Sequence, residues 1–103
     1  MLFLARYTIA LEDVETAMAK RIEFDEVKPD SMRIVCEYAA HGVSAPLSGV
    51  LVFETDDVEV LNFLVLYYGE TVQLDIRACS DVLDAIKTSQ KSLGAIRGSS
   101  ADE

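Results

Sequence analysis

A single histidine and a few charged side chains are the residues of this chain that could do chemistry. His41 is the only histidine, and because an imidazole titrates near neutrality it could act as a general base or a haem ligand. The simpler interpretation, which we favour, is a solvated loop residue. The histidine, cysteine and acidic residues do not show the spacing of a transition-metal site, which needs at least three converging ligands. We therefore expect neither a metal nor another cofactor.

A second group of candidate residues comes from segments whose alternating patterns predict strands. Arg6 and Asp75 are expected to be cross-strand neighbours, and such a pair could hold a carboxylate or polarise a carbonyl in a closed cavity. With His41 they are the only catalytic candidates. The candidate ligand-binding residues are Arg6, Glu37, Tyr38, Asp75 and Arg77. The alternative is an ion-pair network across a dimer seam, and it is the interpretation we favour.

Residues 48–79 are the stretch that must position these side chains, and they predict a strand, a helix and a strand. Residues 49–54 form an apolar run of strand length. Asp56 is expected to cap the helix together with Glu59, and Gly69 to end it in a left-handed conformation. Residues 71–77 alternate between apolar and polar side chains, as a half-buried strand does.

The first part of the chain repeats this plan. Residues 2–9 predict a strand, and a helix should follow from about Glu12 and end before Pro29. Its apolar stripe is expected to contain Val14, Ala17, Met18 and Ile22. Residues 32–39 predict the second strand, and the loop 41–48 should join it to the third.

The element order β-α-β-β-α-β predicts an α+β domain over residues 1–79, with the ferredoxin-like pattern of two split βαβ units. Right-handed crossovers give an antiparallel sheet of order 4-1-3-2 with both helices on one face. A third helix should span residues 80–93, ending at Gly94, and residues 94–103 should be a flexible tail. The open face of the sheet is apolar at its centre, so we expect two sheets to face each other in a dimeric α/β barrel.

The second helix is apolar over most of its circumference, which is typical of a helix covered on more than one side. One side should pack on the sheet. The other side should be covered by a partner subunit, by the C-terminal segment or by a ligand. The residues expected at such an interface are Phe63, Leu66 and Tyr67. The four tyrosines could also line a pocket, although aromatic residues at this spacing are more often part of a core.

Composition limits the partners of this chain. Its 103 residues indicate one domain, and 18 acidic against 9 basic residues give a net charge of −9. Nucleic acids and anionic membranes would be repelled, so neither is expected to bind. The N-terminal segment lacks a basic region and a cleavage site, which favours a strand over a signal peptide. Cys36 and Cys79 are expected at opposite sheet edges as reduced thiols, which indicates a cytoplasmic protein.

The segment MLFLARYT, the run from Gly49 to Asp57 and the apolar helix before TVQLDI together resemble a family of short proteins known as a domain of unknown function. That family is similar to the dimeric α/β-barrel superfamily, which includes cofactor-free monooxygenases, isomerases, haem enzymes and non-catalytic binders. Family members tend to place an aromatic residue directly before a histidine, whereas here two alanines separate Tyr38 from His41. The resemblance implies the fold and offers no established reaction.

Two functions follow as hypotheses. The first is a non-catalytic, homo-oligomeric binding or assembly module that engages a protein partner or a small apolar ligand. The alternative is a small cofactor-free enzyme of the monooxygenase or isomerase type, with Arg6 and His41 around a barrel cavity. The two differ in whether polar groups converge on a cavity, because fold alone does not imply function.

Overall fold

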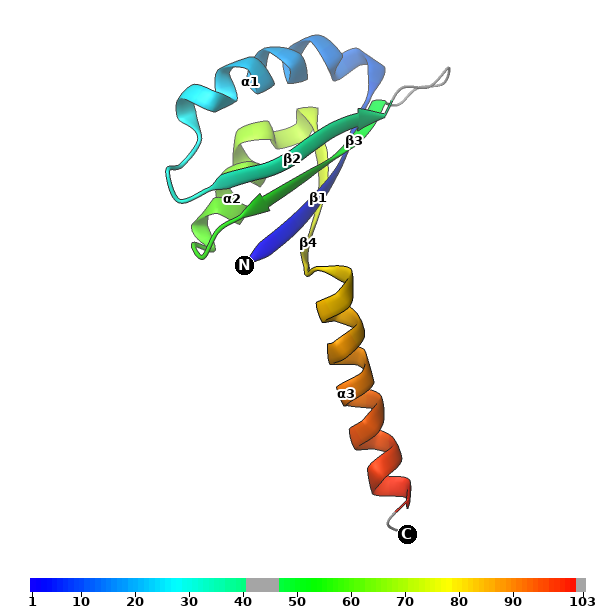
Figure 1. The fold of residues 1–103 in the computed structure, drawn as a ribbon. Coiled ribbons are helices and arrows are strands. Elements are labelled where there is room, and N and C mark those ends of the chain that lie inside the picture. The colour runs from blue at the N-terminus through cyan, green and yellow to red at the C-terminus, as the bar shows by residue number, and fades with distance from the viewer. Residues whose placement is uncertain (41–46, 102–103) are drawn as a thin grey trace.

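The computed structural model describes residues 1–40 and 47–101, with side chains up to residue 98. Its four strands form one antiparallel sheet, and α1 and α2 lie on the same face of that sheet (Figure 1). The elements in chain order are β1 (Leu2–Ile9), a 3-10 turn (Leu11–Asp13), α1 (Val14–Val27), β2 (Arg33–Ala40), β3 (Leu47–Glu54), α2 (Glu59–Tyr68), a second 3-10 turn (Gly69–Thr71), β4 (Gln73–Cys79) and α3 (Val82–Ala101).

The sheet order is β2-β3-β1-β4, which is the predicted order 4-1-3-2 counted from the other edge. The predicted α+β, ferredoxin-like class is therefore confirmed. Arg6 lies opposite Val50 on one side and Asp75 on the other, as expected for a central β1. Cys36 and Cys79 lie on the two edge strands, and both are free thiols.

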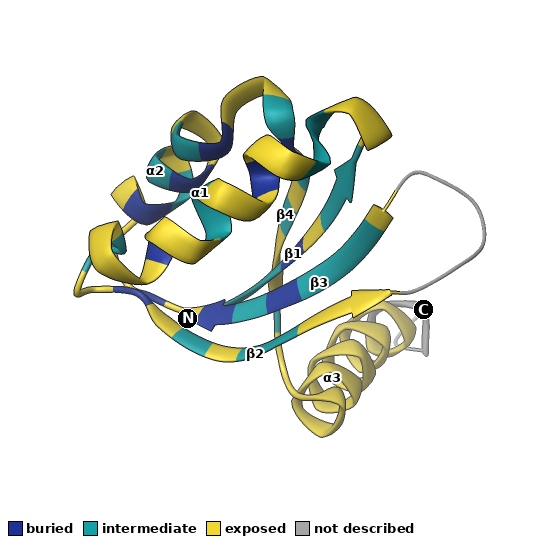
Figure 2. Cartoon of the chain, turned by 90° about the horizontal axis from the view of Figure 1, so that it is seen from above, coloured by how far each residue is buried: buried dark blue, intermediate teal, exposed yellow. Residues whose placement is uncertain are grey.

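The core lies between the sheet and the two helices. Phe53 of β3 and Phe24 of α1 are almost completely buried, and Val60 and Leu64 of α2 complete the contact layer. The rings of Phe63, Tyr67 and Tyr68 all lie within about 6 Å of the Phe24 ring, so α1 and α2 are joined by an aromatic cluster. Figure 2 shows the buried positions on the sides of the helices and sheet that face each other.

The start and end of α2 differ in how well the sequence predicted them. Gly69 has φ 55° and ends the helix, as expected for the residue that follows a helix C-terminus. Asp57, not Asp56, serves the first turn, because its Oδ1 accepts from the amide of Glu59 at 3.0 Å. Asp56 instead accepts from the N-terminal amine of Met1 at 2.9 Å. The predicted cap at Asp56 is wrong by one residue.

An irregularity in β2 reverses which side chains face the helices. The pairing of β2 with β3 shifts between Ile34 and Cys36, as it does at a β-bulge. Ile34 pairs with the core residue Phe53, and Glu37 pairs with the buried Leu51. Because paired residues share a face, Ile34 and Glu37 both face the helices. Glu37 therefore lies on the opposite face of the sheet from Arg6, another of the candidate ligand-binding residues.

The third helix projects away from the sheet (Figure 1), and its described residues are exposed (Figure 2). It passes through Gly94 and continues to Ala101, whereas the sequence predicted an end at residue 93. Gly94 does not have a positive φ, and a glycine inside a helix costs only about 1 kcal/mol relative to alanine. Within the described part of the chain, no helix is both long enough and apolar enough to cross a membrane.

Candidate functional site

A cavity of about 310 Å³ lies between the sheet and helices α1 and α2. Ala17 and Met18 of α1, Leu64 of α2 and Leu51 of β3 contribute apolar side chains to its wall, as do residues of β1 and β4. Its polar side chains are few. Among the described residues they are Tyr7, Arg21, Glu37 and Tyr68, and Ser48 also borders the cavity.

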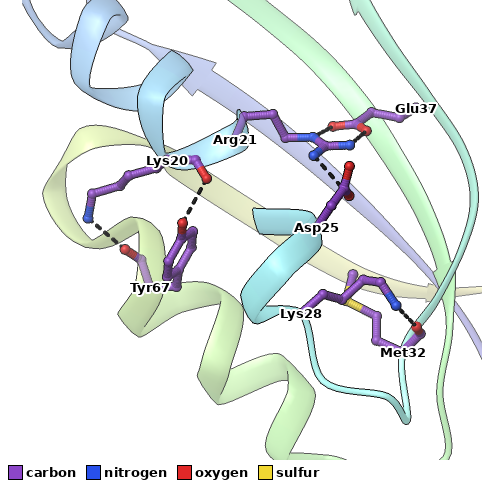
Figure 3. Close-up of polar contacts among 7 residues, drawn as sticks. All are labelled: Lys20, Arg21, Asp25, Lys28, Met32, Glu37 and Tyr67. Carbon is purple, nitrogen blue, oxygen red and sulfur yellow. Dashed lines mark hydrogen bonds and ion pairs between the residues drawn. The ribbon is translucent and has the colours of Figure 1, made fainter. Parts of the chain in front are cut away.

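An ion pair between α1 and β2 forms one wall of this cavity (Figure 3). Arg21 Nε donates to Glu37 Oε2 at 2.8 Å, and Arg21 Nη2 donates to Glu37 Oε1 at 2.6 Å. A third contact joins Arg21 Nη1 to Asp25 Oδ1 at 3.3 Å. The hydrogen bond to Glu37 raises the pKa of Arg21 well above its ordinary value. Two-pronged pairs of this kind have a fixed geometry, so the guanidinium is held in place.

Two tyrosines add hydroxyl groups to the cavity wall. Tyr7 of β1 crosses β3 over Gly49, and its hydroxyl donates to the carbonyl oxygen of Tyr38 at 3.5 Å. Tyr68 is the last residue of α2 and is only 9% exposed. Burial raises the pKa of Tyr68 to about 12, with Arg21 acting in the opposite direction. A phenol is already protonated at neutral pH, because its ordinary pKa is about 10, and burial also raises the pKa of Tyr7. Both hydroxyls can therefore donate hydrogen bonds.

The predicted interface residues of α2 take part in packing within the chain. Phe63 and Tyr67 stack on each other with ring centroids 5.5 Å apart, and both contact Phe24 of α1. The Tyr67 hydroxyl donates to the Lys20 carbonyl, and Lys20 Nζ donates to the Tyr67 carbonyl, each at 2.7 Å (Figure 3). Of these three predicted interface residues, Leu66 alone is mostly exposed, at 80%, and could contact another molecule.

The open face of the sheet collects most of the candidate residues predicted from the strands. Tyr38, Val50, Arg6 and Asp75 form one row across the four strands. Arg77 lies one row along, and its Nε contacts the Asp75 carboxylate at 3.3 Å. Arg6 and Asp75 also border a more open hollow of about 500 Å³.

These positions separate the predicted catalytic candidates from the cavity. Arg6 and Asp75 lie on the face opposite to it, and Arg6 has no ion-pair partner among the residues described. His41 lies outside the described residues. In the described ranges, no group of three or more His, Cys, Asp or Glu side chains could hold a metal ion.

The family comparison matches the domain over nearly its whole length. The family described as domain of unknown function DUF3303 matches residues 1–93. The chain belongs to the DUF3303 family. No curated protein sequence matches it. The family resemblance stated from the sequence is thus confirmed.

Two solved structures are similar to this DUF3303 domain in fold. One is described as a putative antibiotic biosynthesis monooxygenase from Deinococcus radiodurans, with 6% identity, a TM-score of 0.46, and coverage of 80% of this chain and 95% of the other. The second is described as an antibiotic biosynthesis monooxygenase, with 13% identity, a TM-score of 0.45, and coverage of 79% and 100%. At this level of similarity, we base the functional argument on the domain's own residues.

Sequence reasoning missed the side chains that give the cavity its polarity. Arg21 and Tyr68 line the cavity and are not among the candidate catalytic or ligand-binding residues predicted from the sequence. The expected α1 stripe included Ile22, which is 77% exposed, and omitted Phe24, which is 1% exposed. The spacing from Ala17 to Arg21 and Phe24 marks the true inner face, because residues four and three apart share one side of a helix.

Proposed function

We propose that this DUF3303 domain is a binding module that holds one small, mostly apolar molecule between its helices and its sheet. The observation that carries the proposal is a cavity of about 310 Å³ lined by many apolar and a few polar residues. Small-molecule sites have volumes of roughly 300–1,000 Å³ and this same mixture of many apolar and few polar groups.

Solution NMR with indole, an uncharged two-ring molecule, tests this function. We expect saturable shifts of the amides of Ala17 and Leu64, which line the cavity. Ala39 is exposed and borders the cavity, so Ala39→Trp should block entry without disturbing the core. Ala85→Trp, on the exposed surface of α3, is the matched control and should bind indole normally. Shifts that persist in Ala39→Trp, or that spread over the whole surface, would contradict the proposal.

We also propose that a second copy of the chain covers the open face of the sheet. This face presents half-buried Leu4, Val50 and Val52 at its centre, and apolar faces of this kind commonly mark interfaces. Its charged residues are Arg6, Arg33, Glu54, Asp75 and Arg77. With three cations and two anions, this face does not share the strong acidity of the whole chain, so two copies would not repel each other there.

Native mass spectrometry tests whether a second copy binds to this face. The expected mass is twice the chain mass of 11.3 kDa. Val50→Asp should give a monomer, because it buries a charge between the two sheets. Leu66→Asp tests the separate prediction of an interface on the outer face of α2 and should leave the dimer intact. A wild-type monomer at micromolar concentration would refute the proposal. Dissociation by Leu66→Asp alone would move the interface to α2.

A further inference from the structure

The polar groups of the cavity indicate which kind of molecule it accepts, an argument that rests on the proposed binding function. We infer that the cavity selects an uncharged molecule that presents a hydrogen-bond acceptor to the Tyr68 hydroxyl, and that it rejects carboxylates. Three observations carry this inference: an unused donor, a guanidinium already paired with two carboxylates, and the size of the cavity.

The unused donor is the hydroxyl of Tyr68. Its side chain lines the cavity and is more than nine-tenths buried. Its ring packs against Phe24 and Tyr67, yet its hydroxyl makes no hydrogen bond to any of the residues described. Among the described residues, no side-chain oxygen or nitrogen is both fully buried and unpaired, so this hydroxyl is accessible to a small molecule although the ring is buried. A ligand oxygen in the cavity could accept from this O–H.

The guanidinium of Arg21 does not attract an anion, because carboxylates of this chain already occupy it. It donates twice to Glu37 and once to Asp25. One positive and two negative charges leave this group with a net charge of −1. A carboxylate entering the cavity would lose its hydration and lie near Glu37, and both effects are unfavourable. The net charge of −9 on the whole chain acts in the same direction.

Tyr7 does not compete with Tyr68 as the free donor, because its hydroxyl already donates to the Tyr38 carbonyl.

The cavity volume of about 310 Å³ limits the size of the ligand. A cavity of about 150 Å³ in another protein holds one benzene molecule. Twice that volume suits a molecule of about a dozen non-hydrogen atoms.

Three probes of nearly the same shape separate the effects of charge and hydrogen bonding. 4-Phenylbutan-2-one is neutral and carries a carbonyl acceptor. 3-Phenylpropanoate replaces its acetyl group by a carboxylate, and (3-methylbutyl)benzene replaces it by an isopropyl group. Calorimetric or NMR titration of the full chain should rank the ketone first. We expect the carboxylate to bind at least tenfold more weakly, since its charge must be desolvated.

Two substitutions with matched controls assign these effects to residues. Tyr68→Phe should weaken ketone binding about two- to tenfold, the range for one neutral hydrogen bond, and leave the hydrocarbon unaffected. Tyr67→Phe removes a hydroxyl that bonds Lys20 outside the cavity and should change neither. Glu37→Gln should raise the affinity for the carboxylate at least tenfold, whereas Glu26→Gln, on the exposed side of α1, should not.

The outcomes separate failure of this inference from failure of the proposed function. If all three probes bind equally, or if Tyr68→Phe leaves the preference for the ketone intact, the cavity binds ligands but does not select them as inferred. If the carboxylate binds as tightly as the ketone, the argument from Arg21 and Glu37 is refuted. If no probe binds up to its solubility limit, the binding function itself is refuted.

Discussion

Replacing Gly49 by alanine should destabilise the sheet because two groups occupy the space of the added methyl group. Gly49 of β3 lies beneath the phenol ring of Tyr7, which crosses from β1 toward β2. A Cβ atom at this position would overlap the Tyr7 hydroxyl and also the Tyr38 carbonyl oxygen, well inside van der Waals contact. The tyrosine could swing away, but the carbonyl belongs to the backbone of β2 and can move only with its strand.

The expected cost follows from these two overlaps. Forcing one extra carbon into a packed region costs about 1–3 kcal/mol, and the backbone contact places Gly49→Ala in the upper part of this range. For a domain of this size each kcal/mol lowers Tm by about 4–8 °C. The melting temperature should therefore fall by about 8–24 °C. In a Tyr7→Ala background the loss should be smaller but should not vanish, because the overlap with Tyr38 remains.

Thermal unfolding followed by circular dichroism is the assay, with Gly94→Ala as the matched control. A Cβ at Gly94 meets no atom within 4 Å, so the same chemical change there should not lower the melting temperature and should increase helicity slightly. A Gly49→Ala protein that melts like the wild type would refute the close approach of Tyr7 and β2. Complete rescue by Tyr7→Ala would refute the role given to the Tyr38 carbonyl.

Three further predictions follow. Phe24→Ala should lower the free energy of unfolding, measured by urea titration, by about 3–5 kcal/mol, because Phe24 is only 1% exposed. The control Leu66→Ala, at an 80% exposed position, should change it by no more than about 0.5 kcal/mol. Burial raises the pKa of Tyr68 from 10.0 to about 12, so between these pH values the folded state keeps a proton that the unfolded chain loses. The free energy of unfolding should therefore fall from pH 10 to 12, and Tyr68→Phe should reduce that fall. Labelling under denaturing, non-reducing conditions should modify both Cys36 and Cys79, and an unlabelled pair would contradict the sheet order.

Local patterns were sufficient to predict the strands and their order. Alternation of Val72, Leu74 and Ile76 with polar neighbours marks β4, and Gly69 marks the end of the helix before it. Once the elements are placed, the handedness of crossovers leaves few sheet orders. The positions of Arg6 and Asp75 as cross-strand neighbours followed from that order.

The cavity could not be predicted because it depends on contacts between distant segments. A shift of pairing after Ile34 turns Glu37 toward the helices, and the segment RIVCEYAA contains no glycine to mark it. Arg21 then lies on the inner face of α1 because Glu37, 16 residues away in the sequence, neutralises it there. A buried face with a charged residue does not show an apolar stripe, so periodicity favoured Ile22 over Phe24.

The projecting α3 helix changes how this protein should behave in hydrodynamic measurements. A compact chain of this length has a radius of gyration of about 13 Å, whereas this one has 18.0 Å and spans 61 × 35 × 20 Å. The helix alone accounts for about 30 Å of length, at 1.5 Å per residue. A single chain should therefore diffuse slowly and elute early from a gel-filtration column, at a volume expected of a larger globular protein. The added friction of one projecting helix would make a monomer elute like a dimer. The number of chains should therefore be determined by a method that measures mass directly.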